Sequence, residues 1–172
     1  MRYFTSFLFV LSLLFVSCEG DPGPPGPQGP PGQDGDIFAA ESFETPFIDF
    51  NQNNDFSALL EIDPPFPQDY AVFVYRLAID QMVTNGPDIW QLLPQPIIFG
   101  DGSDLFYNYD HSQFDVFIFL ESSSSLIGLD PIFTEGQIFR IVAIPTIDVG
   151  SVDVSNLNSV MQTYGIEAFS RM

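Results

Sequence analysis

Short apolar runs alternate with turn-forming residues from about residue 37 to the end of the chain. The runs are rich in Phe, Ile, Val and Tyr, and most follow one another at intervals of roughly eight to twelve residues, as in all-β sandwiches and barrels. Pro46 interrupts the first run and places it at a sheet edge or a bulge, because proline cannot donate to a sheet ladder. Strands are predicted at Phe38–Phe50, Ser57–Glu61, Tyr70–Ile79, Ile89–Leu93, Pro96–Phe99, Asp104–Tyr109, Phe114–Glu121 and Gln137–Ile144.

The segment Ile89–Glu121 contains four of these runs, separated by three short polar turns, and we expect it to form a four-stranded meander. The last of the four, Phe114–Glu121, is apolar on both faces, and such a strand is expected to be central and covered twice. This favours two packed layers, an antiparallel β-sandwich of the jelly-roll or immunoglobulin-like kind. One face of that strand holds Phe114, Val116, Ile118 and Leu120, and the other holds Phe117 and Phe119.

A single helical pattern follows the predicted strands. Its apolar positions recur at i, i+3, i+4 and i+7, which is typical of an amphipathic helix whose apolar stripe faces the core. Either Asp153 or Ser155 is expected to cap its start, and Gly165 to take the left-handed position after its end. We therefore predict one short C-terminal helix, with its stripe formed by Leu157, Val160, Met161 and Tyr164.

The N-terminus has a different pattern. Arg2 precedes an apolar run from Phe7 to Val16, broken only by Ser12, and this run ends at Ser17-Cys18. A run of about ten apolar residues is too short to span a bilayer and fits a secretory signal. Cys18, the only cysteine of the chain, lies where the run stops.

Six Gly-X-Y triplets follow Cys18 and Glu19, with proline at many X and Y positions. Glycine at every third place is the requirement of a collagen triple helix, and the prolines favour polyproline II. Acidic residues without nearby Lys or Arg oppose close association of three chains, so a weak homotrimer is the most that this segment predicts. A single extended chain of this length would reach on the order of 50 Å and serve as a spacer. The repeat glycines are Gly20, Gly23, Gly26, Gly29, Gly32 and Gly35.

These N-terminal motifs resemble those of a known class of protein. Phe15-Val16-Ser17-Cys18 resembles the lipobox of bacterial lipoproteins, although Phe15 departs from the more common Leu. With the Gly-X-Y segment, the chain is similar to bacterial surface lipoproteins that carry a short collagen-like stretch and an uncharacterised domain. The Gly-X-Y composition predicts a disordered or polyproline II spacer over 18–36, and the strand pattern predicts a β domain over 37–172. The resemblance, which covers residues 1 to about 36, implies a signal peptide at residues 1–17 and acyl chains on Cys18. It also implies export and anchoring to the cell envelope, with the outer membrane surface as the expected location.

The strongly negative net charge excludes some classes of binding partner. The chain has four Arg and no Lys against 23 acidic residues, a formal net charge of −19. Nucleic acids and anionic lipid headgroups are not expected to bind, because their phosphates would be repelled. One cysteine and one histidine also exclude an internal disulfide framework, a cysteine-based zinc site and any site that needs two imidazoles.

Few residues suggest chemistry. Asp101 and Asp104 could contribute oxygen ligands to Ca²⁺, but their spacing does not match an EF-hand loop and favours a hairpin turn. His111 is interpreted as a solvated turn residue, and Arg76 and Arg140 as structural partners of carboxylates. A pair of carboxylates could serve glycoside hydrolysis, yet among 23 acids a pair is no evidence.

Aromatic residues raise a further hypothesis. Exposed rings on a β-sandwich can stack on sugars, and Trp90, Tyr107, Tyr109 and Tyr75 are the candidates. Most of the 19 Phe and 6 Tyr residues must nevertheless form the core. The leading hypothesis is a non-enzymatic, lipid-anchored protein with a structural or interaction role and no cofactor, whose partner is an extracellular protein or a glycan. The alternatives are a glycan-binding module on the same anchor and a carboxylate-dependent hydrolase.

Overall fold

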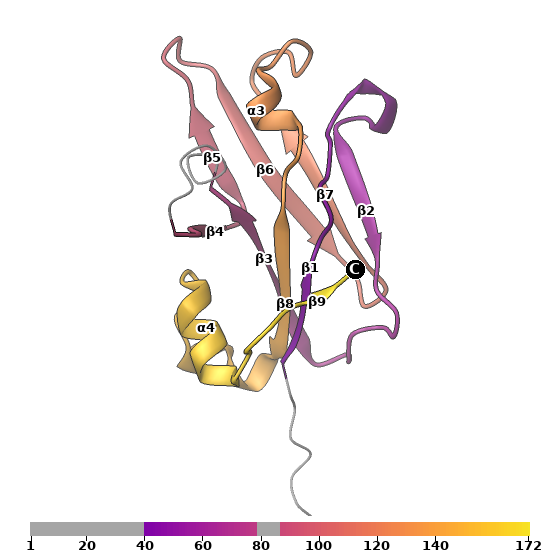
Figure 1. Cartoon of the computed structure of the whole chain (residues 1–172), viewed down its shortest axis with the longest axis vertical. Coiled ribbons are helices and arrows are strands. Elements are labelled where there is room, and N and C mark those ends of the chain that lie inside the picture. Colours follow the sequence, from indigo (N-terminus) through magenta and orange to yellow (C-terminus); the bar gives the residue numbers. More distant parts are fainter. Residues whose placement is uncertain (1–39, 79–86) are drawn as a thin grey trace, which may run out of the picture. The chain divides into compact units, whose positions relative to one another are not determined.

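Two β-sheets pack against each other in the computed structural model, which describes residues 40–78 and 87–172 (Figure 1). The chain divides into two units, residues 1–35 and 36–172, and every described residue belongs to the second. The predicted signal peptide, Cys18 and the Gly-X-Y segment lie outside the described residues. The described part confirms the predicted all-β sandwich with a helix near the C-terminus.

The first sheet has five strands in the order β4-β3-β8-β1-β9. All its pairs are antiparallel except β1 with β9, which is parallel. Its two longest strands, β3 and β8, pair from Tyr70 opposite Pro145 to Arg76 opposite Phe139. The strands are β1 (Glu41–Glu44), β3 (Tyr70–Leu77), β4 (Trp90–Leu92), β8 (Phe139–Pro145) and β9 (Ser170–Arg171).

The second sheet has four strands in the order β2-β7-β6-β5, and all of its pairs are antiparallel. Its strands are β2 (Ser57–Glu61), β5 (Gln95–Ile98), β6 (Asp104–His111) and β7 (Asp115–Glu121). The turn between β5 and β6 contains Gly102 at φ 86°, a conformation that glycine adopts without strain. β7 lies between β2 and β6, which confirms its predicted central place in a sheet.

The core lies between the two sheets and is built from alternate residues of their strands. Side chains of β3 and β8 meet side chains of β6 and β7, since period-2 alternation sends every second residue inward. Phe50 joins this core from the loop after β1, with its ring edge against the rings of Tyr107 and Phe139. Fully buried members include Val74, Leu105, Tyr107, Val116, Ile118, Phe139 and Ile141.

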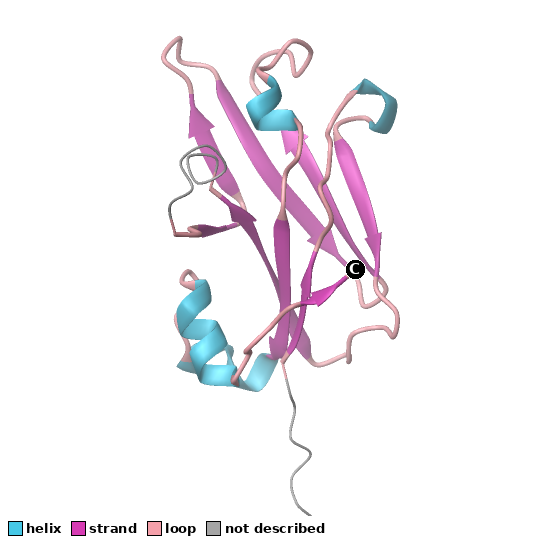
Figure 2. Ribbon diagram, in the orientation of Figure 1, coloured by secondary structure: helices cyan, strands magenta, loops and turns pink. Residues whose placement is uncertain are grey.

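The opposite face of the five-stranded sheet has its own cover. The segment η3 (Thr146–Ser151) and the helix α4 (Leu157–Tyr164) follow β8, and Leu157 and Val160 of α4 pack with Tyr75, Val142 and Ile144 of the sheet. Figure 2 shows these helical segments together near one end of the sheet. β3 and β8 therefore carry buried apolar side chains on both faces, because this sheet has a cover on each side.

Two short helical segments complete the described fold. The segment η2 (Gln52–Asn54) precedes β2, and α3 (Pro131–Thr134) lies between β7 and β8. The Asp130 side chain caps α3 by accepting the Ile132 N–H at 3.0 Å. Neither segment was predicted, since each is a turn or less of helix and too short to show apolar periodicity.

Several expectations need correction. Only β5, β6 and β7 form a meander, because β4 pairs with β3 in the other sheet. The first predicted strand is shorter than expected, because β1 ends at Glu44, before Pro46. β1 is not an edge strand, since it pairs with β8 on one side and with β9 on the other.

The helix α4 is capped by neither predicted residue but by Asn156, whose side chain accepts the N–H groups of Asn158 and Ser159. The predicted left-handed Gly165 is confirmed at φ 65°.

Candidate binding surface

The outer face of the four-stranded sheet is the candidate binding surface. Strand alternation defines it, because the residues between its members point into the core. No described element packs against this face, whereas η3 and α4 cover the other sheet. The expectation that β7 would be covered on both faces is therefore wrong for the described residues. Its apolar members are Leu59, Pro96, Ile98, Phe106, Phe117 and Phe119.

Several of these apolar side chains are open to solvent. Leu59 and Ile98, on the two edge strands, are 60% and 69% exposed, and Phe117 on the central strand is 37% exposed. The rings of Phe117 and Phe119 stack with centroids 5.5 Å apart at an interplanar angle of 26°. Leu59 is directly opposite Phe117 in the register. An apolar patch with a stacked aromatic pair on a sheet face marks a potential interaction site.

The charged residues of the same face are all acidic. Glu61 pairs directly with Asp115, Asp110 with Phe117, and Asp104 with Ile98. Glu121 is opposite Phe106 and accepts a hydrogen bond from the Asn108 side chain. The outward positions of these four strands, all of them described, include no Lys, Arg or His. The face therefore combines exposed apolar surface with a uniformly negative charge.

Tyr107 and Tyr75 do not belong to an exposed platform, although both were candidates for stacking on a sugar. Both are fully buried. The Tyr107 hydroxyl donates to the Phe133 carbonyl, and the Tyr75 hydroxyl donates to the Val154 carbonyl at 2.7 Å. Burial raises the pKa of Tyr107 to about 12, with Arg76 opposing the shift, and burial likewise raises the pKa of Tyr75. Their phenols serve the packing of the sandwich.

Trp90 and Tyr109 are half-buried, and each is engaged by neighbours. The Trp90 ring has the Arg140 guanidinium 4.0 Å above its centroid and packs with the α4 side of the five-stranded sheet. The Tyr109 hydroxyl donates to the Val72 carbonyl at 2.9 Å, and its ring packs against the core between the sheets. The structure thus brings none of the four candidate aromatics onto the exposed face.

Asp101 and Asp104 lie at the β5–β6 hairpin, as the turn interpretation predicts. Asp101 accepts hydrogen bonds from the Ser103 N–H and hydroxyl at 2.9 and 2.7 Å, and these bonds lower its pKa. Asp104 accepts the Ser123 N–H at 2.8 Å. Both carboxylates therefore stabilise loops by accepting hydrogen bonds from backbone N–H groups. Within residues 40–78 and 87–172, no cluster of three His, Cys, Asp or Glu side chains is arranged to hold a metal ion.

Arg140 and Arg76 differ in their partners. Arg140 pairs with Glu44 at 2.9 Å between Nε and Oε2, which confirms the predicted carboxylate partner. Arg76 is almost fully buried and donates to the Gln95 and Gln137 side-chain oxygens at 2.8 and 3.1 Å. Its guanidinium also lies 4.1 Å from the Tyr107 ring centroid. A carboxylate partner for Arg76 stays a prediction.

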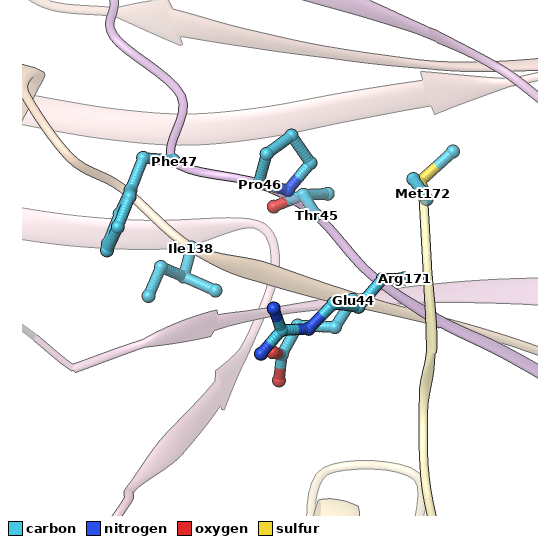
Figure 3. Close-up of a pocket in the computed structure, with 7 residues that line it drawn as sticks. All are labelled: Glu44, Thr45, Pro46, Phe47, Ile138, Arg171 and Met172. Atoms are coloured by element: carbon cyan, nitrogen blue, oxygen red, sulfur yellow. The ribbon is translucent and has the colours of Figure 1, made fainter.

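A groove of about 440 Å³ lies beside β1 and β9. Figure 3 shows Phe47 and Met172 at its two ends, with Ile138 and Pro46 between them. Glu44, the acidic residue of its lining, is already paired with Arg140. The groove therefore offers apolar contact and the exposed Arg171, but no converging set of polar groups that would orient a small ligand.

Two other hollows each hold a pair of carboxylates, the arrangement that a hydrolase would need. Asp49 and Glu135 line one, and Asp88 and Asp153 line the other. Asp49 accepts the Gly136 N–H at 2.7 Å, and Asp153 accepts the N–H and hydroxyl of Ser155. One acid of each pair thus fixes a loop, and the hydrolase hypothesis stays a prediction without support from this geometry.

Comparisons with protein families, curated proteins and solved structures found no match for this chain. Among the described helices, none has the length and apolar character needed to cross a membrane.

Sequence reasoning missed the outer face of the four-stranded sheet, although the signal was present. Asp115, Phe117, Phe119 and Glu121 alternate with buried residues, so acids and phenylalanines share one side of β7. A buried second face would not be expected to hold two carboxylates that lack basic partners. The two acidic residues at the ends of β7 therefore indicated that this side of the strand faces solvent.

Proposed function

We propose that this chain is an exported bacterial protein held in the cell envelope by acyl chains on Cys18, with its β-sandwich displayed as an interaction module. The observation that carries the proposal is the position of the only cysteine, directly after Ser17 at the end of a signal-like apolar run. Acyl chains stabilise membrane association by roughly 0.8 kcal/mol for each buried methylene, so several of them on one residue give a lasting anchor.

The Gly-X-Y segment is proposed to act as the spacer between this anchor and the sandwich. Its prolines favour an extended polyproline II chain, which would keep a strongly acidic domain away from an anionic lipid surface. The outer membrane, with the domain on the cell surface, is the proposed location. An interaction role is supported by the outer face of the four-stranded sheet, since exposed apolar patches rimmed by polar residues mark interaction sites.

The glycan-binding alternative takes a different form once the fold is known. The aromatics first considered for stacking are buried or engaged, so a sugar platform would have to use Phe117 and Phe119 instead. Binding of soluble oligosaccharides that is lost in Phe117→Ser would support this alternative.

The anchor is tested with Cys18→Ala in the native host, with Ser17→Ala as the matched control because it keeps a small residue before the cysteine. The wild-type chain and the control are expected in the membrane fraction, with a mature N-terminus that begins at an acylated Cys18 in mass spectra. Cys18→Ala should carry no acyl chains. A wild-type protein that lacks acyl groups, or that retains residues upstream of Cys18, would contradict the proposal.

A further inference from the structure

The outer face of the four-stranded sheet combines two features that point to one class of partner. Its centre is apolar, with Phe117, Phe119 and Leu59 side by side on β7 and β2. All its ionisable side chains are acidic. We propose that this face docks a cationic polypeptide segment that alternates apolar side chains with Lys or Arg, an inference that rests on the interaction role proposed above.

The apolar part of the face supplies the driving force for such docking. Leu59, Ile98 and Phe117 are substantially exposed, and burying apolar area is favourable roughly in proportion to the area removed from water. Leu59 and Ile98 lie on the two edge strands, β2 and β5, and Phe117 lies on the inner strand β7. A partner that covers all three would therefore lie across the sheet.

The acidic residues determine the sign of the partner's charge. Glu61 and Asp115 are directly opposite each other on neighbouring strands, where like charges repel. Asp110 lies beside Phe117 on the next strand, so carboxylates occur on both sides of the apolar centre. Lysine or arginine side chains from a partner would offset this repulsion, and complementary charge speeds association and excludes wrong partners.

The same charges argue against other occupants. A second copy of the chain docking through the same face would bring like carboxylates together, since a twofold contact joins identical patches. Anionic lipid headgroups would meet repulsion. A neutral glycan could stack on Phe117 and Phe119, but it would leave the facing Glu61 and Asp115 without a counter-charge.

The test uses the full chain carrying Cys18→Ala, so that the result does not depend on acylation. The probes are three short synthetic peptides: one alternates lysine with leucine, one alternates glutamate with leucine, and one alternates lysine with serine. Calorimetry should detect binding of the lysine–leucine peptide alone, weakening as salt is added. Equal binding of the glutamate peptide, or equal binding of the lysine–serine peptide, would overturn the proposal.

Face variants then locate the contact. Phe117→Ser should weaken binding of the lysine–leucine peptide by about tenfold, as loss of a central apolar contact typically does. Ile98→Ser, on an edge strand, should weaken it less. Ile147→Ser is the matched control, because Ile147 is 86% exposed and lies on η3, away from this face. Thermal unfolding of each variant verifies that it is folded. Unchanged binding by a folded Phe117→Ser variant would overturn the proposal.

Charge variants separate cationic recognition from other outcomes. The double variant Glu61→Gln/Asp110→Asn should weaken binding several-fold and reduce its salt dependence, whereas Asp88→Asn/Glu167→Gln should not, because neither residue lies on this face. Soluble oligosaccharides and sedimentation are run in parallel. Oligosaccharide binding or dimerisation that is abolished by Phe117→Ser, without peptide binding, would assign the face to a glycan or to a second copy and overturn the proposal.

Discussion

At the scale of single residues, the described domain holds several of its buried polar side chains with partners inside the sandwich. Gln137 is the clearest case: it is fully buried, its side-chain oxygen accepts from Arg76, and its side-chain nitrogen donates to the carbonyls of Ile132 and Glu135. Such satisfied groups are costly to disrupt, since removal of one leaves others buried without a partner. They hold the loop around α3 to the core.

Tyr107 gives a prediction for alkaline pH. Its pKa rises from the ordinary 10.0 to about 12 in the folded chain because of burial, so folding favours the protonated phenol. Its contribution to stability is therefore complete below pH 10 and declines as the pH rises from 10 toward 12. Because the chain has no lysine, few other side chains titrate in this range. We expect the thermal midpoint to fall steeply above pH 10.

Phenolate absorbance measured with thermal unfolding tests this expectation. The buried tyrosines should ionise together with unfolding, while a urea-unfolded sample should titrate near pH 10. Tyr107→Phe is the control and should make the alkaline fall in stability shallower, although loss of the bond to Phe133 lowers stability at neutral pH by about 1 kcal/mol. A phenolate signal that titrates fully near pH 10 in the folded chain would contradict the prediction.

At the scale of elements, Arg140 links four segments of the five-stranded sheet. It extends from β8, pairs with Glu44 of β1, and lies 4.0 Å from the ring of Trp90 on β4 and 4.4 Å from the ring of Phe169 just before β9. Cation–π contacts stabilise by about 0.5–2 kcal/mol each, and a partly exposed ion pair by about 0–1 kcal/mol. The two aromatic contacts are therefore expected to dominate.

We predict that Arg140→Ala lowers the free energy of unfolding by about 2 kcal/mol, because both ring contacts and the ion pair are lost. Trp90 is the only tryptophan, so its fluorescence reports directly on this site. Its emission should shift to the red in Arg140→Ala as water replaces the guanidinium. Glu44→Gln, which removes only the ion pair, should cost less than about 1 kcal/mol; a larger cost than that of Arg140→Ala would refute this ranking.

The strands with regular alternation could be predicted from the sequence, and those defined by distant pairing could not. Ser57–Glu61 matches β2 residue for residue, since its pattern is bounded by turn signals on both sides. β9, of only two residues, has no pattern and exists because β1 offers a free edge. Ile89–Leu93 contains a strand, but its sheet depends on β3, and local sequence does not reveal which partner a strand pairs with.

The candidate surface was predictable in its residues but not in its exposure. Alternation places Phe117 and Phe119 on one side of β7 and Ile118 on the other. Whether a helix covers that side depends on where α4 packs, and the apolar stripe of α4 fits either sheet equally well as far as sequence shows. The packing of Leu157 and Val160 on β3 and β8 decides the matter and leaves the other sheet open.

At the scale of the whole molecule, charge is the dominant property. With 23 acidic residues against four Arg, repulsion among carboxylates opposes the compact state. Arg140 forms an ion pair with Glu44, and four Arg side chains can neutralise only a few of the 23 carboxylates. Added salt should therefore stabilise the fold by screening, since the Debye length falls to about 10 Å at 0.1 M salt.

We predict that the thermal midpoint rises by several degrees between low salt and about 0.3 M NaCl and then levels off as screening becomes complete. Glycerol at equal osmolarity is the control for effects that do not involve charge. A midpoint that is unchanged or lower in NaCl would show that the carboxylates do not limit stability.

The pairing of β1 with β8 has a consequence for the order of folding. Glu44 and Arg140 meet although 96 residues separate them, so the first strand of the domain gains its partner only when nearly all of the chain is available. Folds dominated by such long-range contacts form slowly, because the entropy of loop closure must be overcome first. In a polypeptide that emerges N-terminus first, the five-stranded sheet would accordingly stay incomplete until β8, in the last third of the chain, has emerged.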